Sequence, residues 1–163
     1  MIVLGIDPGV RKLGYALVKF EHNQKTIVDS GILFDDTSIT NRMDRFAKMV
    51  NIYDFFQELS KTQQVDVVAI ERLYFTDRNQ SNAEFVYGIR WALVTLFYSQ
   101  KVHIQEIDPV QVKKYITWNA KADKKLVQGK IMQIYWLQHM PEYNDSADAL
   151  GMAYIGNIIC ASH

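Results

Sequence analysis

The sequence predicts an α/β fold in which helices flank a five-stranded mixed sheet. Two observations lead to this class. The first part of the chain holds three segments of strand character, at 2–6, 14–20 and 26–33, separated by short turns. The rest alternates apolar strand segments with longer stretches of helical spacing. An antiparallel meander of three strands, followed by two parallel strands connected through helices, gives such a sheet.

Each expected strand has its own signal. The run 2–6 is apolar and ends in Asp7-Pro8-Gly9, which is typical of a strand that enters a turn. The segment 14–20 alternates along its length, as a strand with two different faces does. The fourth strand, 65–70, is β-branched and almost wholly apolar, which indicates burial on both faces. The fifth strand is expected at 102–107.

Helices are expected in five places: 41–62, 81–100, 109–116, 123–139 and 144–159. The first is marked by the helical spacing of five apolar residues, namely Phe46, Met49, Val50, Tyr53 and Phe56. Asp108 followed by Pro109 is a typical helix start. Pro141 ends the fourth helical segment, and Asn144 is expected to cap the last helix.

Length and composition narrow the class of protein. The 163 residues predict one domain, 1–163, and 48% hydrophobic residues are typical of a globular chain. No apolar run approaches the roughly 18 residues of a membrane span, and no basic leader precedes the first strand. Cys160 is the single cysteine, so an intramolecular disulfide is excluded. We therefore expect a cytoplasmic protein.

Charge is unevenly distributed although the formal net charge is zero. The segment 101–130 contains seven lysines against three acidic residues, whereas 131–163 contains three acidic residues and no Lys or Arg. A basic segment followed by an acidic one suits an enzyme that holds phosphates and places metal ions beside them. For the lysines alone, a solvated helix face is the simpler interpretation.

Four acidic residues lie at strand ends and at a helix start, which are positions that suit hydrolytic chemistry. Asp7 ends the first strand, Glu71 ends the fourth, and Asp145 and Asp148 share one face of the first turn of the last helix. Carboxylates are hard oxygen ligands that suit Mg²⁺ or Mn²⁺. Two such ions, about 4 Å apart, assist phosphodiester hydrolysis. Taken singly, each residue could be only a turn former, a helix-dipole partner or an exposed strand end.

Five motifs together resemble the RuvC family of Holliday junction resolvases, in order and near the usual spacing. They are GIDPG at 5–9, AIE at 69–71, QVKK at 111–114, ADK at 122–124 and DSADAL at 145–150. The resemblance covers essentially the whole chain. It implies an RNase H-like fold and a structure-selective endodeoxyribonuclease that resolves Holliday junctions by paired, symmetric cuts in DNA recombination and repair. It also implies two Mg²⁺ ions per active site, with Mn²⁺ able to substitute.

The resemblance also implies roles for individual residues. The family's catalytic and metal-binding positions fall on the four carboxylates, and its DNA-contacting lysines match Lys113 and Lys124. Arg90, in the helix after Glu71, matches an arginine of the family pattern and is included among the predicted DNA-binding residues. RuvC proteins place an aromatic residue near Tyr74, which favours stacking of this ring on an unpaired base over packing in the core. Between Tyr74 and Phe75 the choice stays open.

Trp118 lies in the lysine-rich loop, where stacking on a base and core packing are both compatible with the sequence. As partners, the resemblance implies four-way branched DNA, a second copy of the chain and a branch-migration helicase complex, with no membrane. The dimer contact is expected on the helix 81–100, where Trp91 and other aromatic residues cannot all occupy one stripe.

Other function classes share part of this pattern. Another RNase H-like nuclease, such as a YqgF-like protein of ribosomal RNA processing or a general branched-DNA nuclease, is the first alternative. Actin-like ATPases and sugar kinases begin with a similar motif but need a second domain, for which the chain is too short. A catalytically dead DNA-binding module would not require carboxylates at all four positions.

Overall fold

The structure is a computed structural model of the chain. It describes residues 1–9, 11–22, 24–34, 42–74, 80–139 and 141–162. Phe75 lies outside these ranges. No helix within them is long and apolar enough to cross a membrane.

A five-stranded mixed sheet forms the centre of the molecule, in the order β3-β2-β1-β4-β5. Its strands are β1 (Ile2–Asp7), β2 (Leu13–Glu21), β3 (Gln24–Leu33), β4 (Val67–Glu71) and β5 (His103–Ile107). The first three pair antiparallel, whereas β4 runs parallel to both β1 and β5. The predicted meander with two added parallel strands is therefore confirmed.

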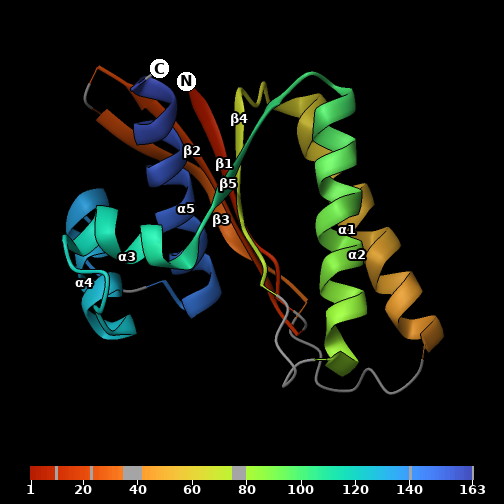
Figure 1. Cartoon of the computed structure of the whole chain (residues 1–163). Helices are drawn as coiled ribbons and strands as arrows, with labels where there is room; N and C mark the ends of the chain where they lie inside the picture. Colours follow the sequence, from red (N-terminus) through yellow and green to blue (C-terminus); the bar gives the residue numbers. More distant parts are fainter. Residues whose placement is uncertain (10, 23, 35–41, 75–79, 140, 163) are drawn as a thin grey trace.

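Helices cover both faces of the sheet (Figure 1). On one face lie α1 (Arg42–Thr62) and α2 (Gln80–Ser99), and on the other lie α3 (Pro109–Thr117), α4 (Lys124–Tyr135) and α5 (Asn144–Ala161). Successive side chains of a strand point to opposite faces of the sheet, so each face has its own hydrophobic core. Val3 belongs to the core beneath α5, and its neighbour Leu4 to the core beneath α1 and α2.

Two glycines allow α5 to lie directly against the sheet. A Cβ atom at Gly5 would lie 2.0 Å from the backbone oxygen of Ala149, and one at Gly14 would lie 2.1 Å from that of Asp145. Any side chain at these two positions would therefore push α5 away from β1 and β2. The glycines fix the position of the acidic first turn of α5 relative to the end of β1.

Two local predictions were wrong, and both concern helix ends. The helix expected at 41–62 is confirmed as α1. Its buried row is Lys48, Ile52, Phe56 and Leu59, at steps of three or four residues, while Phe46 and Val50 are 44% and 56% exposed.

The helix α4 ends at Tyr135, four residues before the expected end at His139. Trp136 adopts a left-handed conformation and its N–H donates to carbonyls of the preceding turn, which closes the helix there. Asn144 does not cap α5: Tyr143 holds the cap position, and the side-chain oxygen of Asn144 accepts from Gln128 Nε2 at 2.8 Å. The remaining boundaries agree within two residues.

Candidate active site

The C-terminal ends of β1 and β4 bring Asp7 and Glu71 together. The two strands are adjacent and parallel, so residues that end them share one edge of the sheet. The first turn of α5 carries Asp145 and Asp148 to the same edge. One carboxylate oxygen from each of Asp7, Asp145 and Asp148 lies within 4.8 Å of the others.

Burial and mutual repulsion make Asp7 hard to ionise. Desolvation is the main cause that raises its pKa well above the ordinary value, and the charges of Glu71, Asp148 and Asp145 add to it. Its carboxyl donates a hydrogen bond to Glu71. Burial likewise raises the pKa of Glu71, although the hydrogen bond from Asp7 opposes the shift.

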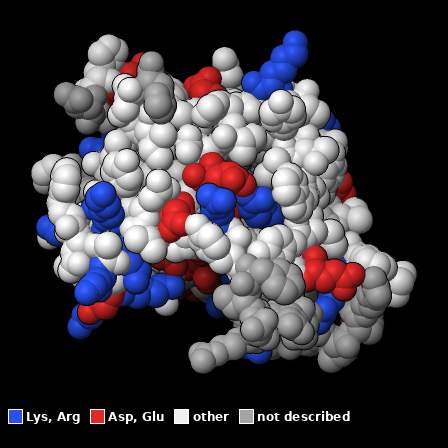
Figure 2. All heavy atoms as spheres, in the orientation of Figure 1, with Lys and Arg blue, Asp and Glu red and all other residues white. Residues whose placement is uncertain are grey.

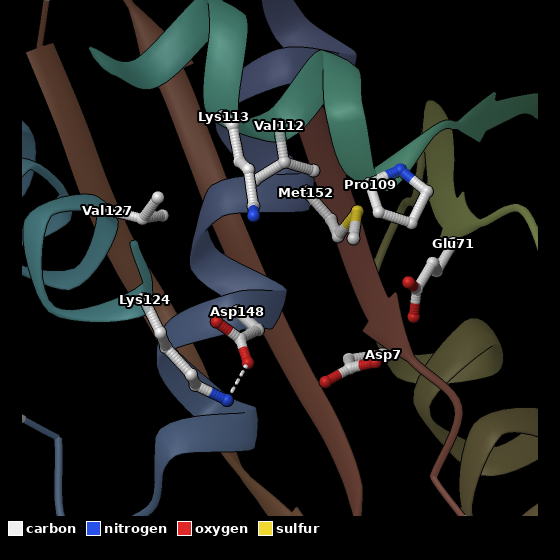
Figure 3. A pocket seen from close by; sticks show the side chains of 9 residues that line it. All are labelled: Asp7, Glu71, Pro109, Val112, Lys113, Lys124, Val127, Asp148 and Met152. Carbon is white, nitrogen blue, oxygen red and sulfur yellow. Dashed lines mark hydrogen bonds and ion pairs between the residues drawn. The ribbon is translucent and has the colours of Figure 1, made fainter. Parts of the chain in front are cut away.

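A cavity of about 290 Å³ opens over this edge of the sheet (Figure 3). Its lining residues are Asp7, Glu71, Pro109, Val112, Lys113, Lys124, Val127, Asp148 and Met152. The acidic residues come from β1, β4 and α5, and the basic ones come from α3 and α4. The cavity thus has a carboxylate side and a lysine side, which suits an anionic substrate held beside cations.

The two predicted DNA-contacting lysines both reach this cavity. Asp123 accepts from the N–H of Leu126 and caps α4, which places Lys124 at the first position of the helix. Lys124 Nζ lies 2.8 Å from Asp148 Oδ2. Partial burial alone would lower the pKa of Lys124, but Asp148, Asp145 and Asp7 outweigh it and raise the pKa. Lys113 points into the cavity from α3 (Figure 3).

The donor set fits a hard divalent cation. It consists of carboxylate oxygens, and within the described residues of the cavity Lys124 alone forms an ion pair with one of them. Four acids beside two lysines leave excess negative charge in a partly buried place, which costs free energy unless cations bind. Asp7, Asp145 and Asp148 could together hold such an ion, with Glu71 at the adjoining position.

Arg90 lies beneath the site rather than in the cavity. Its side chain is only 4% exposed. Its Nε donates to the carbonyl of Glu71 at 3.1 Å, and its guanidinium pairs with the carboxylate of Glu106 on β5. The ring of Trp91 lies 5.4 Å from the guanidinium carbon. This position does not favour the predicted contact of Arg90 with DNA and instead ties α2 to the end of β4.

Tyr74 is 55% exposed beside the site, as expected for a stacking residue. Its hydroxyl donates to the carboxylate of Asp108, the N-cap of α3, and Arg72 lies 5.7 Å from its ring. The hydrogen bond holds the ring next to the helix that carries Lys113. Stacking on a base stays a prediction.

Sequence reasoning missed several residues around the site. Glu106 was not singled out, and Asp108 was identified only as a helix start, because their partners Arg90 and Tyr74 lie 16 and 34 positions away in the chain. Met152 also lines the cavity, and its position could have been predicted from the sequence, since it lies one helical turn beyond Asp148 on the same face of α5.

Comparison with known proteins agrees with the motif pattern. The family model of crossover junction endodeoxyribonuclease RuvC matches residues 3–156. The RuvC of Alkaliphilus metalliredigens is 35% identical, over all of this chain and 93% of the relative. That of Petrotoga mobilis is 30% identical, over 94% of this chain and 91% of the relative.

Solved structures agree on the fold. Thermus thermophilus RuvC in complex with a Holliday junction substrate superposes with a TM-score of 0.84 at 23% identity, covering 99% of this chain and 96% of that one. The yeast mitochondrial Holliday junction resolvase Ydc2 gives 0.65 at 16% identity, over 93% and 75%. The predicted RNase H-like architecture is thus confirmed. From the family match and the full-length relatives, the chain belongs to the RuvC family of crossover junction endodeoxyribonucleases.

Proposed function

We propose that this chain resolves four-way DNA junctions by metal-dependent hydrolysis of paired phosphodiester bonds. The observation that carries the proposal is the cavity in which the carboxylates of β1, β4 and α5 (Asp7, Glu71 and Asp148) face two lysines from α3 and α4. A fourth carboxylate, that of Asp145, lies within 4.8 Å of those of Asp7 and Asp148. Family membership gives the reaction class, and a relative of the same fold is bound to a Holliday junction substrate. The RNA-processing alternative is not favoured, because the RuvC family model spans residues 3–156.

The carboxylates would hold Mg²⁺, with Mn²⁺ as a substitute and two ions per site. Such ions, when bound, lower the pKa of the attacking water and stabilise charge on the leaving oxygen. Asp7, Asp145 and Asp148 supply the oxygens that lie within 4.8 Å of one another, and Glu71 adds a fourth carboxylate next to Asp7. A bound cation also removes the repulsion that makes Asp7 hard to ionise.

The lysines would hold the phosphate backbone. Lys113 points into the cavity and is free to meet a phosphate oxygen with its ammonium group. Lys124 is paired with Asp148 at 2.8 Å, so it can exchange this carboxylate for a phosphate when a cation binds the aspartate. Both residues would then stabilise negative charge that grows at the reacting phosphate.

Paired cuts require two sites related by a two-fold axis, which a C2 dimer supplies. We propose that α2 forms the contact, since Trp91 and Tyr98 on it are 59% and 74% exposed. At least one outward-facing residue was predicted among Phe85, Tyr87, Trp91 and Phe97, and the exposed Trp91 agrees with that prediction. A cytoplasmic location and a branch-migration helicase partner stay predictions.

The proposal is tested by incubating the protein with synthetic four-way junctions, flaps and duplexes, with and without Mg²⁺. We expect paired cleavage of junctions only when the metal is present. Asp7→Asn, which removes one carboxylate and keeps its size, is the matched control and should bind junctions without cutting them. Equal cleavage of junctions and linear duplexes, or cleavage in EDTA, would contradict the proposed function.

A further inference from the structure

Trp118 combines full exposure with an unfavourable backbone. Its side chain is 91% exposed, so the core-packing interpretation is excluded. It is the C-cap of α3, with φ of 59°, and its N–H donates to the carbonyl of Lys114 at 2.9 Å. Glycine is the usual residue at such a left-handed position, because a Cβ atom crowds the backbone there. Its ring is therefore accessible to a partner, and its surroundings decide which kind of partner it suits.

The surroundings of Trp118 are basic. Lys114 precedes it on α3, and Lys121, Lys124 and Lys125 follow in the connection to α4 and its first turn; all four are exposed. Figure 2 shows basic side chains gathered on the side of the molecule where α3 and α4 lie. An exposed aromatic ring among lysines matches the chemistry of nucleic acid, where phosphates meet the charges and sugars and bases meet the ring.

The position of Trp118 relative to the candidate active site suits a duplex arm. Pro109 at the start of α3 and Lys113 in its middle line the cavity, and Trp118 follows the last residue of the helix. At about 1.5 Å rise per residue, Trp118 lies about 7.5 Å along the helix axis beyond Lys113, the last residue of α3 that lines the cavity. The ring is therefore outside the cavity and close to it.

We propose that the surface formed by Trp118, Lys114, Lys121 and Lys125 binds a duplex arm of the DNA substrate next to the cleaved bond. The indole ring packs against sugar and base edges of that arm while the lysines neutralise its phosphates. The inference rests on the proposed function, and it adds to the two cavity lysines a second contact region outside the cavity.

Trp136 provides a matched control within the same chain. It is 88% exposed, has φ of 55° and caps α4 as Trp118 caps α3. However, it lies twelve residues beyond Lys124, about 18 Å along the helix, and the chain from 131 to 163 contains no Lys or Arg. The two tryptophans therefore share exposure and strain and differ in charge surroundings and in distance from the cavity.

The first test measures junction binding in EDTA, so that the DNA stays intact, for wild type, Trp118→Ala, Trp118→Phe and Trp136→Ala. We expect Trp118→Ala to raise Kd about tenfold, which is about 1.4 kcal/mol of binding free energy. Trp118→Phe should retain most of the affinity, and Trp136→Ala should bind as wild type does. A wild-type protein that binds no junction refutes the proposed function, whereas normal binding by Trp118→Ala refutes only this inference.

A second pair of variants separates binding from folding. Trp118→Gly and Trp136→Gly should each raise Tm by a few degrees, because glycine relieves the left-handed strain. Only Trp118→Gly should bind junctions more weakly. Hydroxyl-radical footprinting gives the location: wild type should protect sugars of a duplex arm next to the cut, and Trp118→Gly should lose part of this protection whereas Trp136→Gly should keep all of it. Loss of affinity in both variants, or a footprint that does not change, would overturn the inference.

Discussion

Replacing Arg90 tests whether this residue belongs to the interior or to the DNA surface. Arg90→Met keeps the length of the side chain and removes the guanidinium that bonds the carbonyl of Glu71 and the carboxylate of Glu106. The buried carbonyl then loses a charged donor, which costs about 1.5–3 kcal/mol. Glu106 is 48% exposed, so water can replace its partner and the ion pair adds about 1 kcal/mol at most.

The expected loss is therefore about 1.5–4 kcal/mol in the free energy of unfolding. For a chain of this size that corresponds to a fall in Tm on the order of 10 °C. Thermal and urea unfolding measure it, with Glu106→Gln as a control that removes the ion pair but leaves the bond to Glu71. The control should cost about 1 kcal/mol or less.

The rate of junction cleavage is the second measurement on the same variant. Because Arg90 holds the backbone at Glu71, Arg90→Met should cleave junctions more slowly while its Kd for junctions, measured in EDTA below the unfolding temperature, stays near that of wild type. An unchanged Tm together with weakened junction binding would refute this reasoning and would restore the DNA contact predicted from the sequence.

Four further outcomes are expected. Asp7→Asn should abolish cleavage and raise Tm in EDTA, because a buried carboxylate with like-charged neighbours is lost. Since the raised pKa of Asp7 means that ionisation destabilises the fold, the Tm advantage of this variant should grow as pH rises from about 4 and vanish in acid. Lys113→Ala and Lys124→Ala should each reduce the log–log salt slope of junction binding by about 0.9, and an unchanged slope and rate would leave them as solvated lysines. Tyr74→Phe, which loses only the bond to Asp108, should bind junctions normally, whereas Tyr74→Ala should bind weakly; equal affinity of both would exclude stacking.

Residues whose role depends on strand and helix ends could be predicted from the sequence. Asp7 and Glu71 end apolar strands, and parallel neighbours end at one sheet edge, so their meeting followed from topology. The spacing of Asp145 and Asp148 placed both on one helical face. These inferences use only local periodicity and the order of elements, which the sequence carries directly.

Residues whose role depends on long-range packing could not be predicted in this way. The burial of Arg90 arises from the approach of α2 to β4 and β5, and no local pattern distinguishes it from an exposed arginine. Likewise, helical spacing alone did not reveal which face of α1 packs inward, since Phe46 and Val50 belong to the apolar spacing and are exposed. The end of α4 at Trp136, whose backbone is left-handed, could not be predicted either, because glycine is the residue that normally indicates such a helix end.

The sheet places α1 and α2 on one side and α3, α4 and α5 on the other, and this separation has an evolutionary consequence. The surface proposed for pairing two copies and the surface proposed for handling DNA can accumulate substitutions independently, since effects of distant residues add without interaction. Arg90 is the exception, because it extends from α2 to the strand end that carries Glu71. Lineages that remodel α2 would therefore tolerate change at Trp91 more readily than at its neighbour, even though both residues lie on the same helix.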